Sequence, residues 1–190
     1  EVGTKLPQIN SDDGTLILGN AGRLTLQKGQ QHLIEVAEKL KNQNIKFKLY
    51  IAGTGELYDE LQASITAKNL RNEVLLLGFV ADMEAFMRSI DVFLLTSSWE
   101  GFGFVIVEAM AKGKPVVAFD ITSNPEIVTD GKTGLLAKHP DVNDFVAKTV
   151  EIIQNANLRQ QLGSQAKQSV VDRFLITERI TELEEYLLNN

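Results

Sequence analysis

The sequence predicts an α/β domain built on a doubly wound, parallel sheet of six strands, with helices on both faces and a helical C-terminal tail. Three observations predict this class: six short apolar runs, amphipathic segments between them, and a helical pattern throughout residues 141–190. Continuous apolar runs of about 4–8 residues are typical of strands covered on both faces. Strands that alternate with helices favour βαβ units joined by right-handed crossovers.

The apolar runs are rich in Leu, Val, Ile and Phe. They predict strands over residues 15–20, 47–52, 74–78, 92–96, 115–119 and 134–137. No internal repeat or interdomain linker separates them, so we expect one domain over residues 1–190, with residues 1–14 as a polar lead-in. Because the first residue is Glu and not Met, we expect the chain to be a piece of a longer protein.

The segments between the runs carry apolar residues at every third or fourth position, which indicates helices with one buried face. These positions are Leu33, Val36, Ala37 and Leu40 in one segment and Leu57, Leu61 and Ile65 in the next. A further helix is expected over residues 82–90, with Asp82 as its N-cap.

The tail is helical in pattern from Asp141 onward. Its first helix has an apolar stripe that consists of Phe145, Val146, Thr149, Ile152 and Ile153. Two more helices are expected over residues 157–173 and 177–188.

The composition excludes several classes of protein. With 25 acidic and 19 basic residues the net charge is −6, which disfavours nucleic-acid binding. The chain has no cysteine, so it can form neither disulfides nor thiolate zinc sites. No apolar stretch approaches the roughly 20 residues that span a bilayer, and no signal peptide is visible. No spacing of His, Asp or Glu suggests a metal site.

Ligands of doubly wound sheets bind at the carboxyl ends of the strands, where the strand order reverses, so the segments after each strand carry the functional prediction. Arg23 and Lys28 follow the first strand. Two cations close to the start of a helix oppose the helix dipole, and an anionic ligand would resolve this conflict. Two solvated surface charges are an equally acceptable interpretation.

The second strand is followed by Gly53 and Gly55. A dinucleotide-binding fingerprint needs a third glycine where this chain has Tyr58, so the signal is weak. A tight turn between strand and helix explains the two glycines about as well as a close approach to a ligand.

The segment after the fourth strand is the most informative. Glu100 lies in a loop, and a helix is expected to begin near Phe104, although the β-branched residues after it also suit a strand. The free N–H groups of such a helix would point at the ligand site. Glu108 stands among apolar residues, where a carboxylate is rarely buried without a partner. Glu100 and Glu108 could accept hydrogen bonds from the hydroxyls of one bound molecule.

After the fifth strand, Glu126 follows Pro125. It could be a third acidic residue of the same site or only part of a helix start, and the sequence does not distinguish these.

Together these segments resemble the nucleotide-sugar-binding half of the GT-B glycosyltransferases, especially the retaining family numbered four, also described as glycosyl transferases group 1. The match runs through Gly22-Arg23-Leu24, Lys28-Gly29, "IAGTG", "GFV", "EGFGFVIVEAMAKGKPVVA" and "PEIVTDGKTGLLA". It covers residues 15–140 and includes the highly specific E-x7-E spacing, in which Glu108 follows Glu100 by eight positions.

The resemblance implies a role for each matching residue. Arg23 and Lys28 would bind the donor diphosphate, Glu100 would contact the donor sugar, and these three would serve catalysis. Glu108 would bind the ribose hydroxyls. The remaining expected contacts with the donor are Gly103 near the phosphates, Val80 near the base, and Phe102, Phe104, Gly53 and Gly22.

The resemblance also implies a reaction. A glycosyl group would pass, with retention and without metal or other cofactor, from a UDP-, GDP- or ADP-linked sugar to a glycan or lipid-linked acceptor. The acceptor would be held by an N-terminal domain that is absent from this chain, so we expect the isolated domain to be inactive. Surface polysaccharide or lipopolysaccharide synthesis, in the cytoplasm or at the inner face of its membrane, is the pathway implied.

One departure concerns the loop before Pro125, where many members have a Gly-Gly pair and this chain has Ser123-Asn124. The change bears on which sugar is recognised. The alternatives are a non-catalytic nucleotide-binding or regulatory module on the same scaffold, and a sugar-phosphate synthase or epimerase. A dehydrogenase is disfavoured by the missing third glycine.

Overall fold

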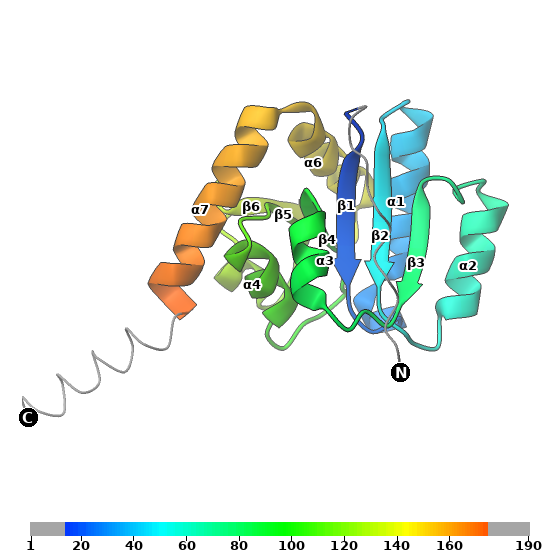
Figure 1. The fold of residues 1–190 in the computed structure, drawn as a ribbon, viewed down its shortest axis with the longest axis horizontal. Coiled ribbons are helices and arrows are strands. Elements are labelled where there is room, and N and C mark those ends of the chain that lie inside the picture. The colour runs from blue at the N-terminus through cyan, green and yellow to red at the C-terminus, as the bar shows by residue number, and fades with distance from the viewer. Residues whose placement is uncertain (1–13, 175–190) are drawn as a thin grey trace, which may run out of the picture.

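The sheet in the computed structural model, which describes residues 14–174, has six parallel strands in the order β3-β2-β1-β4-β5-β6 (Figure 1). The strands are β1 (Leu16–Ala21), β2 (Phe47–Ala52), β3 (Val74–Gly78), β4 (Val92–Leu95), β5 (Val116–Asp120) and β6 (Gly134–Lys138). The predicted fold class is therefore confirmed, and each strand lies within one residue of its expected bounds.

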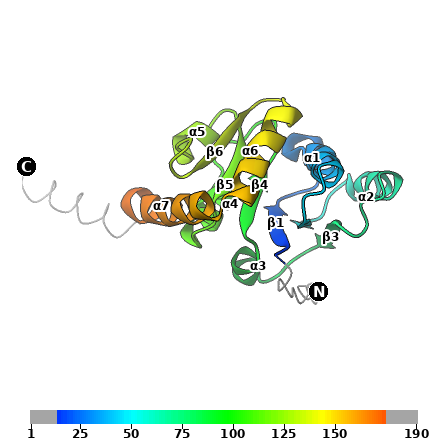
Figure 2. The same ribbon diagram turned by 90° about the horizontal axis from the view of Figure 1, so that it is seen from above.

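Helices cover both faces of this sheet, and Figure 2 shows α1 and α2 on the side opposite α3. The short helices are η1 (Leu26–Lys28) and α5 (Asn124–Ile127), and the longer ones are α1 (Gln30–Asn42), α2 (Tyr58–Ala67), α3 (Met83–Ser89), α4 (Phe104–Ala111), α6 (Val142–Gln154) and α7 (Ala156–Phe174). Successive strand residues point to opposite faces, so Leu94 belongs to the buried cluster that includes residues of α1, α2 and α6, while Phe93 belongs to the cluster that includes residues of α3 and α4. The expected helix over 177–188 lies outside the described residues.

The start of α3 follows the predicted capping chemistry. The Asp82 carboxylate accepts a hydrogen bond from the Ala85 amide at 2.8 Å, which satisfies a free N–H group of α3. Asp141 does the same for two amides at the start of α6. Pro125 stands in the first turn of α5, where its missing N–H group costs nothing.

Residues 104–111 form a helix, as expected, and not a strand. Ile106, Ala109 and Met110 are buried and lie on one side of α4, at the spacing of a helical face. Phe104 and Glu108 lie on its exposed side. Packing on the sheet and against α7 thus overrides the strand propensity of three consecutive β-branched residues.

The strand order reverses between β1 and β4. From β1 the chain adds β2 and β3 on one side, and it then returns to begin β4 on the other. The register of β1 and β4 is short, with partners Leu18–Val92 and Gly19–Phe93. The Asn20 side chain extends this contact by donating a hydrogen bond to the Leu94 carbonyl at 2.8 Å. Beyond that point the two connections diverge, which opens a crevice at the carboxyl edge of the sheet.

Candidate functional site

A cleft of about 910 Å³ occupies this crevice, between the segments that follow β1, β2, β3 and β4 and the first turns of α4. The structure brings all of the predicted site residues to this one cleft: Gly22, Arg23, Lys28, Gly53, Val80, Glu100, Phe102, Gly103, Phe104 and Glu108. The placement agrees with the predicted site, while the role of each residue stays a prediction.

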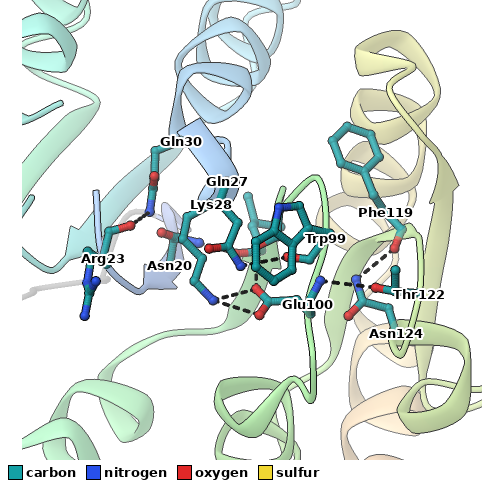
Figure 3. Close-up of polar contacts among 12 residues, drawn as sticks. Asn20, Arg23, Gln27, Lys28, Gln30, Trp99, Glu100, Phe119, Thr122 and Asn124 are labelled. Atoms are coloured by element: carbon teal, nitrogen blue, oxygen red, sulfur yellow. Dashed lines mark hydrogen bonds and ion pairs between the residues drawn. The ribbon is translucent and has the colours of Figure 1, made fainter. Parts of the chain in front are cut away.

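An ion pair between Lys28 and Glu100 lies at the centre of the polar contacts (Figure 3). Lys28 Nζ donates to both carboxylate oxygens of Glu100, at 2.7 Å to Oε1 and 2.8 Å to Oε2. The Glu100 side chain is only 6% exposed and that of Lys28 is 22% exposed. The buried Ser97 hydroxyl also donates to Glu100 Oε1, at 2.6 Å. A carboxylate held this way keeps one orientation, because three short contacts fix both of its oxygens.

Hydrogen bonds also tie together the loops that carry this pair. Gln27 Nε2 donates to the Trp99 carbonyl at 3.1 Å, and the Ser98 amide donates to the Gln27 carbonyl at 2.8 Å. The Glu100 amide donates to Thr122 Oγ1 at 3.1 Å. The loops after β1, β4 and β5 therefore meet at Glu100.

Thr122 adopts a left-handed backbone conformation, with φ of 36°. For a β-branched residue this is a rare conformation, and such strain costs roughly 1–3 kcal/mol. The neighbouring Asn124 side chain stabilises the loop by donating to the Phe119 carbonyl at 2.9 Å. Neither Thr122 nor Ser97 was predicted from the sequence, because small hydroxyl residues in a loop carry no distinctive pattern.

Arg23 and Glu108 contrast with the ion pair, since both side chains are exposed. Within residues 14–174, neither the Arg23 guanidinium nor the Glu108 carboxylate has a hydrogen-bond or ion-pair partner. Although Glu108 stands among apolar residues in the sequence, α4 turns its carboxylate toward the cleft and solvent, on the side where the ligand is expected. The enclosed carboxylate is Glu100.

The two cations also differ from the expected arrangement, in which both would be free to hold one anion. Lys28 is already paired with Glu100, whereas Arg23 is unpaired within the described part of the chain. Figure 3 shows the Arg23 guanidinium pointing away from this pair.

The glycines after β2 allow two backbone segments to touch. A Cβ atom on Gly53, whose φ is 143°, would lie 1.9 Å from the Gly22 carbonyl oxygen. One on Gly55 would lie 2.3 Å from the carbonyl oxygen of Leu24. The Leu24 amide donates to the Thr54 carbonyl at 2.9 Å, which holds the segments after β1 and β2 together. The two glycines are therefore required by the close packing of two backbone segments, which is neither the tight turn nor the approach to a ligand considered from the sequence.

Aromatic side chains line the mouth of the cleft. Phe102 and Phe104 make an edge-to-face contact with ring centroids 4.8 Å apart, and both are exposed. Val80 is buried in the wall, whereas its neighbour Phe79 is exposed and lines the cleft without having been predicted. The sequence did contain one indication of Phe79, because an aromatic residue directly after a strand lies at the edge of the sheet where ligands bind.

Glu126 does not join the site. It is exposed in α5, outside the residues that line the cleft, and its carbonyl accepts a hydrogen bond from Arg173. In the part of the chain that the structure describes, no group of three or more His, Asp or Glu side chains could hold a metal ion. No helix over residues 14–174 is long and apolar enough to cross a membrane.

Comparison with known proteins identifies the family of this chain. The model of a family described as Glycosyl transferases group 1 matches residues 3–169. The chain is 32% identical over 167 residues to the poly(ribitol-phosphate) alpha-N-acetylglucosaminyltransferase of Staphylococcus aureus. This alignment covers 87% of this chain and 34% of the relative.

Solved structures show the same fold. A variant of S. aureus TarM in complex with fondaparinux, alpha-GlcNAc-glycerol and UDP superposes with a TM-score of 0.83, at 31% identity, over 98% of this chain and 37% of that one. HepE of Anabaena in complex with UDP superposes with a TM-score of 0.83, at 29% identity, over 93% of this chain and 50% of that one.

The chain spans about a third to a half of the length of these proteins. Its sheet order and neighbours are those of a Rossmann-like half of a GT-B fold, as the sequence predicted. With the family model covering most of the chain, this protein belongs to the glycosyl transferases group 1 family.

Proposed function

We propose that the chain is the donor-binding domain of a glycosyltransferase, which holds a nucleotide-diphospho-sugar for transfer of its glycosyl group with retention. The observation that carries the proposal is the cleft where β1 and β4 diverge, because it combines a cation without a partner among residues 14–174, an exposed carboxylate and a buried, oriented carboxylate. These three features correspond to the diphosphate, the ribose diol and the sugar hydroxyls of one donor molecule.

The diphosphate is assigned to Arg23, Lys28 and the start of α4. An exposed guanidinium can bind phosphate oxygens in a bidentate way, and Arg23 has no competing partner among the described residues. Lys28 would be shared between the diphosphate and Glu100. Charge that develops on the leaving diphosphate would be stabilised by these cations and by the dipole at the start of α4, so the proposal requires no metal.

The hydroxyl groups are assigned to the two carboxylates. Glu108 lies on the cleft side of α4 with both oxygens available, which suits the two vicinal hydroxyls of a ribose. Glu100 retains acceptor capacity on oxygens that Lys28 and Ser97 orient, which suits the hydroxyls of the donor sugar. Phe79 and Val80 would flank the base at the β3 end of the cleft.

UDP-linked sugars are the first donors to test, since two similar structures were solved with UDP. We assign the acceptor, a glycan or a lipid-linked glycan, to the part of the full-length protein outside this chain. A role in surface polysaccharide or lipopolysaccharide synthesis, in the cytoplasm or at the inner face of its membrane, belongs to the same proposal. The related poly(ribitol-phosphate) enzyme supports it at the level of the family.

Isothermal titration of the folded chain with UDP, GDP and ADP tests the proposal. We expect weak binding of UDP, a loss of about tenfold in affinity on Arg23→Gln or on Glu108→Gln, and no turnover by this chain alone. If none of the nucleotides bound at millimolar concentration to a folded sample, the proposal would be wrong. Binding that survived both substitutions would favour a nucleotide-binding module with a different site.

A further inference from the structure

We propose that Thr122 is a positioning residue that fixes the peptide carrying Glu100 and thereby sets how well the site recognises the sugar of its donor. The proposal rests on the proposed function, in which Glu100 contacts that sugar. Thr122 lies on the loop after β5, in the exposed segment that directly precedes Ser123-Asn124. Its hydroxyl oxygen accepts the hydrogen bond of the Glu100 amide at 3.1 Å (Figure 3).

The backbone conformation of Thr122 is one that its surroundings must hold in place. A φ of 36° suits Gly or Asn, and a β-branched residue reaches it only when its surroundings hold it there. The loop supplies that hold, because the Ile121 amide and the Asn124 side chain both donate to the Phe119 carbonyl, at 3.0 and 2.9 Å. A glycine would fit this backbone without strain but could not accept the Glu100 hydrogen bond.

The contact of Thr122 with the Glu100 amide, unlike that of Lys28 with the Glu100 carboxylate, is one for which the donor would not compete. Lys28 fixes the Glu100 carboxylate in the ligand-free chain, but the diphosphate of a donor would draw the same ammonium group toward itself. Glu100 would then depend on Ser97 for its side chain and on Thr122 for its backbone. Gly101, which follows Glu100 in the chain, does little to hold the Glu100 peptide in place, since a Cβ atom on Gly101 would have nothing within 4 Å.

Three substitutions separate the hydroxyl from the shape of the loop. Thr122→Ser keeps the hydroxyl, Thr122→Val keeps the branched shape without an acceptor, and Thr122→Gly keeps the left-handed backbone without an acceptor. For each variant, isothermal titration gives the dissociation constants of UDP, UDP-glucose and UDP-N-acetylglucosamine.

The quantity that tests the proposal is the dissociation constant of UDP divided by that of the UDP-sugar. This ratio should fall roughly two- to tenfold in Thr122→Val and Thr122→Gly, the effect of one hydrogen bond, with UDP itself unchanged. Thr122→Ser should stay within about twofold of the wild-type ratio. The assignment is overturned if Thr122→Gly keeps the wild-type ratio, or if Thr122→Ser loses as much as Thr122→Val.

Hydrogen exchange of the Glu100 amide, measured by NMR in the ligand-free chain, tests the contact without any donor. We expect exchange about tenfold faster in the Val and Gly variants and unchanged in the Ser variant. If the wild-type chain bound no nucleotide at all, the proposed function would fall, and the exchange rates would still decide whether Thr122 fixes the Glu100 peptide. Equal exchange in all variants overturns the assignment.

Discussion

Glu100 and Glu108 stand eight positions apart in one motif and line one cleft, yet the protein treats them in opposite ways. Glu100 is buried and held by Lys28, Ser97 and Thr122, whereas Glu108 is exposed and has no partner among residues 14–174. A buried carboxylate that is already paired makes the fold depend on its partners, and it reaches a ligand in a fixed orientation. One that is unpaired adds little to stability and is fully available to a ligand.

Because of this difference, substitutions around Glu100 and substitutions of Glu108 should change the free energy of unfolding by different amounts. Removing one partner of a buried ion pair leaves an uncompensated charge, which is strongly destabilising. Replacing an exposed, unpaired charge usually changes stability by less than about 0.5 kcal/mol. The same cleft therefore contains positions whose substitution acts mainly on folding and positions whose substitution acts mainly on binding.

The largest effect on stability is expected from Lys28→Met. It should lower the free energy of unfolding by about 3 kcal/mol, because Glu100 is left buried without its cation. Adding Glu100→Gln should recover part of the loss, since it removes the unpaired charge. Urea unfolding followed by circular dichroism measures both changes.

A matched control for this prediction is Lys41→Met. Lys41 pairs with Glu73 at 3.1 Å, but its side chain is 38% exposed, so the loss should be only about 0.5 kcal/mol. Similar losses in Lys28→Met and Lys41→Met would contradict the claim that the pair in the cleft is energetically distinct.

A smaller loss is expected from Ser97→Ala. The hydroxyl donates to a charged oxygen at 2.6 Å in a fully buried position, so its removal should cost about 1.5 kcal/mol in the same unfolding experiment. The matched control is Ser89→Ala, whose partly buried hydroxyl donates only to the neutral Phe86 carbonyl at 2.8 Å and should contribute about 0.5 kcal/mol. A loss at Ser89 as large as that at Ser97 would show that the carboxylate partner adds nothing.

The sequence predicted what depends on local pattern. Strands were placed by continuous apolar runs, the start of α3 by Asp82, and α4 by the alternation of strands and helices, although its β-branched residues also suited a strand. The rule that ligands bind at the carboxyl ends of strands also predicted that the candidate site residues lie at one edge of the sheet, and the structure places them in one cleft there.

What the sequence could not predict depends on pairs that are distant along the chain. The partner of Glu100 is Lys28, 72 positions away, and nothing in either segment indicates that the two would pair. The apolar residues around Glu108 likewise do not show which of them the protein buries: Ile106, Ala109 and Met110 are buried, whereas Phe104 and Val105 line the cleft with Glu108. Thr122 could not be predicted because no sequence pattern indicates its hydrogen bond with Glu100 or its φ of 36°.

The smallest effect on stability, and the sharpest test of the comparison, is expected from Glu108→Gln. The free energy of unfolding should change by less than about 0.5 kcal/mol because the carboxylate is exposed and unpaired within the described residues. UDP affinity should nevertheless fall about tenfold, since charged acceptors bind hydroxyl groups more strongly than neutral amides. The control is Glu151→Gln, an exposed glutamate of α6 outside the cleft, which should change neither quantity. A drop in stability of more than 1 kcal/mol in Glu108→Gln would show that Glu108 is a structural carboxylate like Glu100. Equal UDP affinity in the two variants would show that Glu108 does not bind the ligand.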